Sequence, residues 1–220
     1  TMTDSVFYGN SAYLGQEQGD HFGASVHLIS SAAEIEDCSF RRNRGDYGSA
    51  IFASASNVTL TDCQLTENSA NEGGAIFAEN GCGIQIQNVS LHDNEAHDTG
   101  GAIHALEGST LSVSDSSITS NSASSSGAAV YIESSELLIT DSFLSRNGVD
   151  DTGGAVTCND ISTCNATNTR FVENRAAYGG AISLSNATSG IFMSCIFEDN
   201  VADVSAAVAL VIRSVLTIEI

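Results

Sequence analysis

Two short motifs alternate along this chain of 220 residues and recur at a nearly constant interval. One is an apolar residue three positions before an Asn, and the other is a small-residue cluster, such as Gly-Gly-Ala, followed by Ile or Val. From Asn10, the Asn residues are separated by 33 and then by 25, 26, 27, 26, 27 and 26 residues. Repetition at such a period indicates a solenoid, in which each unit packs mainly against its neighbours.

The residue types within each unit favour β-strands over helices. The units are rich in Ser, Thr, Asn, Gly and β-branched residues, which suit strands and turns. Apolar residues alternate with polar ones, as at Val58 and Leu60 or at Ile84 and Ile86, and period two indicates a strand. A leucine-rich repeat has a similar period but needs a denser Leu pattern. We therefore predict an all-β fold, a single right-handed parallel β-helix of about eight coils of roughly 26 residues with three short strands per coil.

The two ends of the chain fall inside repeat units. Leu216 and Ile218 already begin a further set of inward positions, and the longer first interval predicts a protruding loop over residues 11–22. Bare solenoid ends expose unpaired strand edges. We therefore expect residues 1–220 to form one β-helix segment, uncapped at both ends, that is part of a longer protein or a subunit that stacks end to end.

Equivalent residues in successive coils should stack about 4.8 Å apart, the spacing of paired strands. Inward Asn side chains could then hydrogen-bond to one another along the axis and satisfy turn backbone groups. This structural column comprises Asn43, Asn68, Asn94, Asn121, Asn147, Asn174 and Asn200. The Gly clusters suit bends that need positive φ. A further column, six residues before each Asn, is interpreted as turn residues that bond local backbone; it contains Asp37, Asp62, Asn88, Asp115, Asp141 and Asn168.

Charge excludes several classes of function. The chain has 27 acidic and 7 basic residues, for a formal net charge of -20, and it contains no Lys and no Pro. Few cations are available to displace phosphate counterions, so a nucleic-acid partner and an anionic membrane surface are both disfavoured. No apolar run is long enough to insert this segment into a bilayer.

The alternating F-x-x-N and G-G-A-[ILV] motifs resemble those of the chlamydial polymorphic outer membrane proteins. Strict F-x-x-N begins at Phe7, Phe40, Phe171 and Phe197, and intact G-G-A-[IV] begins at Gly73, Gly100, Gly153 and Gly179. The resemblance covers the whole chain and implies an autotransporter-type surface protein or adhesin. Other parallel β-helix proteins, including pectin-lyase-like ones, share such motifs, so the resemblance transfers fold better than function.

Cysteines and sequons provide candidate modification sites. Cys158 and Cys164 bracket one turn and are the best disulfide candidates, while Cys38 and Cys63 occupy one inward column in neighbouring coils. A disulfide would indicate an oxidising compartment. Glycosylation candidates, in a number expected by chance, are Asn57, Asn88, Asn165 and Asn186.

A possible binding surface follows the Gly clusters. Between inward residues lie His27, Phe52, Phe77, His104 and Tyr131, which should stack as a ladder of rings on the outer wall. Exposed contiguous rings mark a contact with a partner or a sugar face. The alternatives are that a neighbouring loop covers the ladder or that stacking only fixes the register.

The search for an active site finds no convergent constellation. Polysaccharide lyases need a base and often a calcium-binding carboxylate cluster, and hydrolases need two or three converging carboxylates. Asp98, Asp150 and Asp151 do not obviously converge, and the turn that holds His92 and His97 is interpreted as a solvated turn. We therefore predict no enzyme activity, cofactor or metal.

The favoured function is a non-enzymatic structural or adhesive segment, located extracellularly or at the cell surface. Its partner would be another protein, through self-association or a cell-surface receptor, or a glycan. The alternatives are a subunit of an extracellular filament, assembled end to end or laterally, and a carbohydrate-binding or polysaccharide-degrading β-helix.

Overall fold

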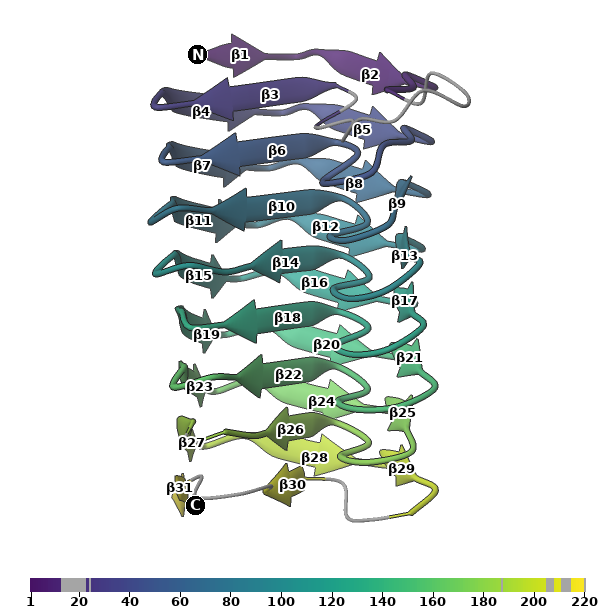
Figure 1. The fold of residues 1–220 in the computed structure, drawn as a ribbon, viewed down its shortest axis with the longest axis vertical. Coiled ribbons are helices and arrows are strands. Elements are labelled where there is room, and N and C mark those ends of the chain that lie inside the picture. The colour runs from purple at the N-terminus through teal and green to yellow at the C-terminus, as the bar shows by residue number, and fades with distance from the viewer. Residues whose placement is uncertain (13–22, 24, 187, 205–207, 211–214, 220) are drawn as a thin grey trace.

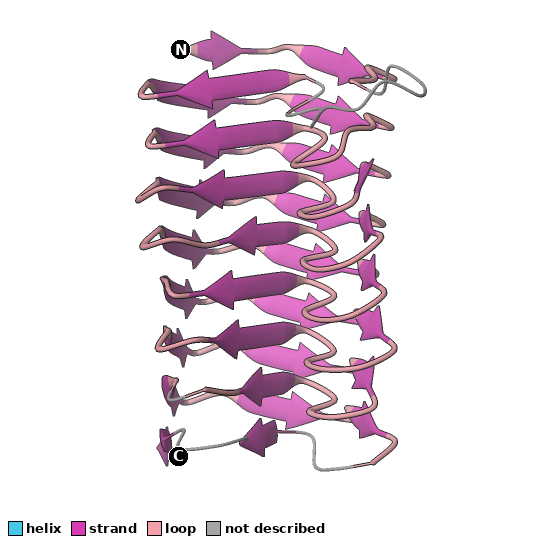
Figure 2. Cartoon of the chain, in the orientation of Figure 1, coloured by secondary structure: helices cyan, strands magenta, loops and turns pink. Residues whose placement is uncertain are grey.

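The computed structural model describes residues 1–12, 23, 25–186, 188–204, 208–210 and 215–219. Its regular elements, within these residues, are all β-strands, and successive coils stack along one axis with the two termini at opposite ends (Figures 1 and 2). Every strand pair is parallel. The prediction of an all-β parallel solenoid is therefore confirmed.

Four sheets run along the axis. The long sheet is made of β1 (Met2–Thr3), β4 (Ala32–Glu36), β7 (Asn57–Thr61), β11 (Gly83–Gln87), β15 (Thr110–Ser114), β19 (Glu136–Thr140), β23 (Thr163–Thr167), β27 (Ser189–Met193) and β31 (Val215–Glu219). The middle sheet is made of β2 (Val6–Tyr8), β5 (Ser39–Arg41), β8 (Gln64–Thr66), β12 (Ser90–His92), β16 (Ser117–Thr119), β20 (Phe143–Ser145), β24 (Arg170–Val172) and β28 (Ile196–Glu198).

The other two sheets complete each coil. The narrow sheet, of two-residue strands, is made of β9 (Ser69–Ala70), β13 (Glu95–Ala96), β17 (Ser122–Ala123), β21 (Gly148–Val149), β25 (Arg175–Ala176) and β29 (Val201–Ala202). The glycine sheet, which follows the Gly clusters, is made of β3 (Val26–Ile29), β6 (Ile51–Ser54), β10 (Ile76–Glu79), β14 (Ile103–Ala105), β18 (Val130–Glu133), β22 (Val156–Asn159), β26 (Ile182–Leu184) and β30 (Val208–Leu210).

Two details of the prediction are corrected. The described strands form about seven turns rather than about eight, because the first and last units each contribute only two strands, β1 with β2 and β30 with β31. Most turns have four strands rather than three. The additional strand lies in the narrow sheet and contains only two residues, which is too short for an alternating pattern to reveal it.

The ends follow the same register. The backbones of Leu216 and Ile218 pair with Gly190 and Phe192, while their side chains lie outside the described residues. The predicted protruding loop over residues 11–22 also lies outside them, apart from Ser11 and Ala12.

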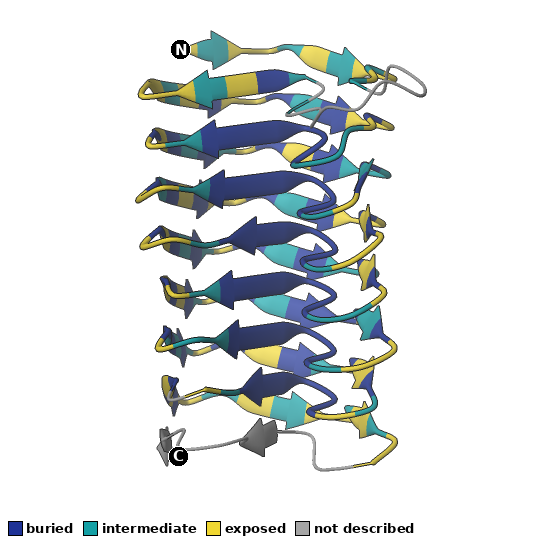
Figure 3. Cartoon of the chain, in the orientation of Figure 1, coloured by how far each residue is buried: buried dark blue, intermediate teal, exposed yellow. Residues whose placement is uncertain are grey.

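Stacked apolar columns fill the interior, because like residues pair with like in successive coils. Val58, Ile84 and Leu111 pair in register and are buried. At the two ends the ring of Phe40 stacks on Phe7 and the ring of Phe171 stacks on Phe197, with centroids 4.6 and 4.9 Å apart. Burying one such side chain contributes about 1.5–3 kcal/mol. The core is therefore a continuous rod rather than a centre with a surrounding shell (Figure 3).

Three corners of each coil share one construction: a residue at positive φ followed by an inward residue. The Asp corner joins the long sheet to the middle sheet, and its positive-φ residues are Asp62, Asn88, Asp115, Asp141, Asn168 and their equivalents at both ends. The Asn corner joins the middle sheet to the narrow sheet and carries the Asn column. Asp and Asn tolerate positive φ better than most residues, which accounts for their frequency at the Asp corner.

The Asn column forms a hydrogen-bonded ladder. The Oδ1 atom of Asn68 accepts the backbone N–H and the Nδ2–H of Asn43, at 3.1 and 2.9 Å. Nδ2 of Asn68 donates to Oδ1 of Asn94 and to the carbonyl oxygen of Phe40 in the preceding coil, both at 3.0 Å. The same pattern recurs along the column to Asn200, which explains the F-x-x-N motif, since the amide bonds the apolar residue's carbonyl one coil back.

The Gly clusters are required where the chain enters the glycine sheet. Gly73 has a φ of +59°, and a Cβ atom on it would lie 2.3 Å from the carbonyl oxygen of Ile76. A Cβ atom on the following Gly74 would lie 2.1 Å from the carbonyl oxygen of Gly101 in the next coil. The first Gly is therefore needed for conformation and the second for close approach between coils.

Candidate functional site

A long groove runs along the Asp corner. It has a volume of about 850 Å³ and crosses six coils, from Asp62 to Ser194. At the spacing of paired strands this corresponds to a length of roughly 24 Å. The groove lies where the long sheet passes into the middle sheet, between the positive-φ residues of the corner and the first outward residues of the middle sheet.

One wall of the groove consists of the positive-φ residues of the corner. Nδ2 of Asn88 donates to Oδ1 of Asp62, and Nδ2 of Asn168 donates to Oδ1 of Asp141. Asp115, between these two pairs, has no side-chain hydrogen bond or ion pair within the described part of the chain. Asp115 and Asp141 are therefore neighbouring carboxylates that no amide separates, an arrangement that costs electrostatic energy.

The opposite wall comes from the first outward position of the middle sheet. It is made of Gln64, Ser90, Ser117, Phe143, Arg170 and Ile196. The guanidinium carbon of Arg170 lies 5.8 Å from the centre of the half-buried Phe143 ring, and Arg170 also pairs with Glu198 at 3.1 Å. This wall carries polar side chains at its N-terminal end, whereas its C-terminal end combines two apolar side chains with the guanidinium of Arg170.

The floor of the groove is formed by inward residues whose polar atoms are already bonded. The backbone N–H of Val89 donates to Oγ of Ser116, at 3.0 Å, and that hydroxyl donates to the carbonyl oxygen of Ser114, at 2.6 Å. Ser142 makes the equivalent pair of bonds. A ligand in the groove would therefore meet the side chains of the two walls rather than a reactive group on the floor.

Sequence reasoning did not identify this groove. It recognised the column of Asp and Asn residues but interpreted it as turn structure that bonds local backbone. The positive φ of Asp62, Asp115 and Asp141 agrees with a turn, whereas the side chains of Asp62 and Asp141 accept hydrogen bonds from Asn residues one coil on. The available signal was the second column, two residues later, which forms the opposite wall.

The ring ladder predicted for the outer wall is instead buried. His27 is exposed, but Phe52 and Phe77 are each 3% exposed, His104 is 4% exposed and Tyr131 is 9% exposed. The rings do contact one another in order, with centroids 4.8, 5.7, 5.0 and 4.8 Å apart. The prediction of an exposed surface is therefore wrong from Phe52 onward, and the glycine sheet is buried on both faces from β6 to β26 (Figure 3).

Residues of the turns that precede the Gly clusters cover this ladder. The ring of Tyr47 packs edge-on against Phe77, at 5.1 Å. Nδ1 of His104 contacts Oγ1 of Thr99 at 3.0 Å and a carboxylate oxygen of Glu72 at 3.2 Å. Among the described residues, Nε2 of His104 has no hydrogen-bond partner. Burial raises the pKa of Tyr131 to about 12, so its hydroxyl stays protonated at neutral pH.

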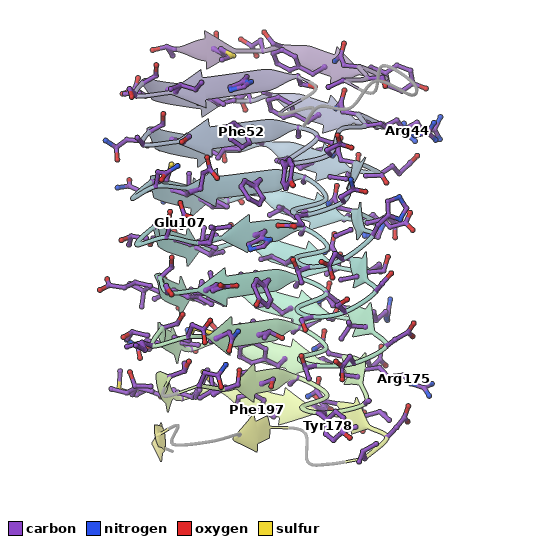
Figure 4. All side chains as sticks on the ribbon, viewed as in Figure 1. Arg44, Phe52, Glu107, Arg175, Tyr178 and Phe197 are labelled. Carbon is purple, nitrogen blue, oxygen red and sulfur yellow. A yellow bond between two sulfur atoms is a disulfide. The ribbon has the colours of Figure 1, made fainter. Side chains whose placement is uncertain are left out.

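Ion pairs between coils reinforce the side of the molecule near the Asn corner. Arg41 and Arg42 both bond Glu67, and Arg146 pairs with Glu173 at 2.8 Å. The hydrogen bonds from Arg42 and Arg41 hold the pKa of Glu67 below its ordinary value. Arg175 of β25, which extends on the same side of the molecule as Arg44 (Figure 4), pairs with Asp203 at 3.1 Å. In each of these pairs, an acidic residue of one coil bonds an Arg of a neighbouring coil.

One of the two suggested cysteine pairs is a disulfide. Cys158 and Cys164 are bonded, and their Cα atoms lie 6.6 Å apart across the corner between β22 and β23. Cys38 and Cys63 are free thiols, which corrects the suggestion that they could pair. Sγ of Cys63 instead accepts the backbone N–H of Cys38, at 3.4 Å, as Ser does elsewhere at this corner. Burial raises the pKa of the Cys63 thiol.

The remaining predicted positions lie on the surface. Asn57, Asn88 and Asn186 are exposed and Asn165 is half-buried, so glycosylation of these residues stays a prediction. Across the described ranges, no group of three or more His, Cys, Asp or Glu side chains could hold a metal ion. Likewise, the described residues contain no helix long and apolar enough to cross a membrane.

Comparisons with known proteins agree with this architecture. Residues 74–219 match the family model described as a right handed beta helix region, which agrees with the predicted handedness. Residues 62–79, which run from the Asp corner to the end of β10, match the Chlamydia polymorphic membrane protein repeat. No curated protein and no solved structure gives a match.

Proposed function

Because the chain belongs to the right-handed β-helix family and carries a polymorphic membrane protein repeat, we propose that it is a non-enzymatic segment of a surface protein, acting as a stalk or adhesin. The match to the Chlamydia repeat supports display at the cell surface. Fold alone would not distinguish this role from that of an enzyme, since many β-helices degrade polysaccharides.

The observation that carries the proposal is the unbroken Asn ladder. Strand pairing bonds each described coil to the next, and so does the ladder of Asn amides from Asn10 to Asn200, whose members from Asn43 to Asn174 bond an Asn on both sides. Buried and fully satisfied polar networks rigidify a structure. Such a ladder joins every coil to its neighbours, which suits a rod that holds a surface at a distance from an anchor.

Surface display is tested with an antibody raised against residues 25–204. In the cells that make the protein, intact and permeabilised cells should be labelled equally, and external protease should remove the signal. Labelling that appears only after permeabilisation would contradict surface display. An antibody against a cytoplasmic protein provides the control for cell integrity.

The adhesive and non-enzymatic parts of the proposal need separate assays. Beads coated with the purified chain should bind host cells, whereas beads coated with urea-unfolded chain should not. Incubation of the native chain with acidic and neutral polysaccharides should release no new reducing ends or unsaturated products. Turnover of any of these polymers by the chain would contradict the non-enzymatic assignment.

A further inference from the structure

We infer that the groove along the Asp corner binds an extended oligosaccharide whose sugars carry free amino groups. This inference deepens the proposed function, because it names a ligand class for the adhesin and rests on that function for its biological use. Its physical basis is independent of where the protein is located. The basis is the shape of the groove, the unpaired carboxylate at its centre and the chemistry of its two walls.

The shape of the groove favours a linear ligand that runs parallel to the axis. Its volume of about 850 Å³ falls within the range of ligand sites, but it is drawn out over six coils. Like positions recur once per coil, so each step along the groove offers a similar set of side chains. A linear chain of pyranose rings presents the same hydroxyl or amino groups at each sugar, so it can bond a surface whose side chains recur once per coil.

The groove offers side chains rather than backbone. At the Asp corner the backbone N–H groups bond carbonyl oxygens of adjacent coils, as when Asp115 donates to Thr140 and Ser117 donates to Val89. An extended peptide gains affinity mainly by adding main-chain hydrogen bonds to a free sheet edge, and this groove has no such edge. Sugar hydroxyl and amino groups can bond carboxylate, amide and hydroxyl side chains directly.

The order of residues along the acidic wall leaves one strong acceptor free. Asn88 bonds Asp62 and Asn168 bonds Asp141, so four members of the column form two pairs. Asp115 lies between the pairs, is exposed and stacks next to Asp141 without an intervening amide. An ammonium group placed between Asp115 and Asp141 would relieve the repulsion between like charges and gain two charge-assisted bonds.

The facing wall supplies groups that suit a sugar ring. Ser90 and Ser117 present hydroxyls at the level of Asn88 and Asp115, and Gln64 presents an amide one coil earlier. Phe143 adds a half-buried ring in the coil that carries Asp141. Hydroxyls bond the polar edge of a pyranose and an aromatic ring packs against its apolar face.

Charge selects among oligosaccharides. The groove contains three carboxylates, Asp62, Asp115 and Asp141, against the single guanidinium of Arg170, which is already paired with Glu198. A chain of uronic acids would place like charges beside these carboxylates, whereas amino sugars are attracted to them. The occupant to which the structure points is therefore a glucosamine-type oligomer rather than a uronate or a sulfated glycan.

Titration calorimetry of the purified native chain with chitosan hexamer, in 150 mM salt, tests the inference. Ser117→Trp fills the centre of the groove and should weaken binding at least ten-fold. Ser112→Trp is the matched control, because Ser112 lies in the same coil, is also half-buried and faces outward from the long sheet away from the groove. It should bind as the unaltered chain does. If Ser117→Trp leaves binding unchanged, the hexamer is held by the general acidic surface and the inference is wrong.

Three further titrations test the assigned chemistry. Asp115→Asn keeps a residue that tolerates positive φ, and it should weaken chitosan binding about five-fold, the scale of an exposed charge pair. Hexagalacturonate should not bind, and N-acetylated chitin hexamer should bind more weakly than chitosan. Equal binding of either oligomer would overturn the amino-sugar assignment. Hexa-arginine binding that Ser117→Trp abolishes, without binding of chitosan, would assign the groove to basic peptides instead. Because these measurements use protein in solution, their failure leaves the cell-labelling result untouched.

Discussion

The Asn corner and the Asp corner have the same backbone conformation, but they differ in how constant the inward residue is from coil to coil. At both corners a residue with positive φ is followed by an inward residue, as in Glu67 with Asn68 and Asp62 with Cys63. At the Asn corner the inward residue is Asn in every coil from Asn10 to Asn200. At the Asp corner the inward residue varies among Cys, Val, Ser and Thr. The recurring Asp and Asn residues of this corner are instead the exposed ones.

The difference follows from the number of bonds that each inward side chain makes. Asn121 accepts two hydrogen bonds from Asn94 and donates one to Asn147 and one to the carbonyl of Leu91. Ser142 accepts one bond, from Ser116, and donates one, to Thr140. A side chain that makes four buried hydrogen bonds cannot be replaced without loss of stability, whereas one that makes two can be exchanged for other residue types. The Asn corner therefore fixes the stacking, and the Asp corner is free to vary its surface.

The largest predicted effect comes from breaking the Asn ladder. Asn121→Ala leaves the carbonyl of Leu91 and two N–H groups of Asn94 without partners in a dry interior. We expect a loss of about 4 kcal/mol in the free energy of unfolding. Urea unfolding followed by circular dichroism measures it. A loss below about 1 kcal/mol would show that the ladder does not hold the coils together.

The second largest loss of stability is expected at the corner between the glycine sheet and the long sheet, where a disulfide links the two strands of one coil. Cys158 and Cys164 enclose Asp160 and Ile161, and Ile161 is a β-branched residue at a φ of 60°. Replacing both cysteines with Ser should cost about 2 kcal/mol, the entropy of a short closed loop. The double variant should unfold at lower urea, and reducing agent should shift the unaltered chain but not the variant. Equal midpoints for the two chains would contradict this.

A smaller effect is expected at the Asp corner, and it completes the comparison. Ser142→Ala removes one acceptor and one donor, which leaves the N–H of Ser116 without this partner, while the carbonyl of Thr140 still accepts the N–H of Asp115. The expected cost is about 1 kcal/mol in urea unfolding. A cost equal to that of Asn121→Ala would remove the distinction between a corner that fixes the stacking and one that can vary.

The sequence predicts those features that depend on repetition. A column such as Asn43 to Asn200 is visible because each member occupies the same phase of a fixed period, and stacked strands require like to lie upon like. The buried core at positions such as Val58 and Leu60 follows from the same period together with strand alternation. The fold could therefore be derived without any knowledge of long-range contacts.

The features that the sequence did not predict depend on what lies beside a strand. Alternation correctly separates Phe52 and Phe77 from the inner side chains, but it carries no information on the turn that folds back over them. Tyr47 and Thr99, which cover neighbouring rings, lie in turns that recur once per coil, but the residue type at this position varies among Tyr47, Glu72, Thr99, Ser126, Thr152 and Tyr178, so no repeated residue marks it. The groove was missed for a related reason. It arises between two columns, one at the corner and one in the middle sheet, and neither column reveals it alone.

The smallest predicted effect tests whether surface pairs add to the stability of the Asn corner. Arg42 and Arg41 lower the pKa of Glu67 below its ordinary value of 4.5. Since the folded pKa is depressed, the pair stabilises the fold above pH 4.5 and its contribution is lost as the pH falls through the folded value.

The Glu67→Gln variant should therefore melt slightly below the unaltered chain at pH 7, and the two melting temperatures should converge at low pH and in 1 M salt. Glu173→Gln, which removes the Arg146 pair from the same surface column, is the matched comparison at pH 7 and in 1 M salt. A difference in melting temperature that persists at low pH would mean that Glu67 acts through packing rather than charge. Convergence of the two melting temperatures would show that the exposed residues of the Asn corner contribute to stability by electrostatics alone. The stacking of the coils at this corner would then be fixed by the buried Asn amides.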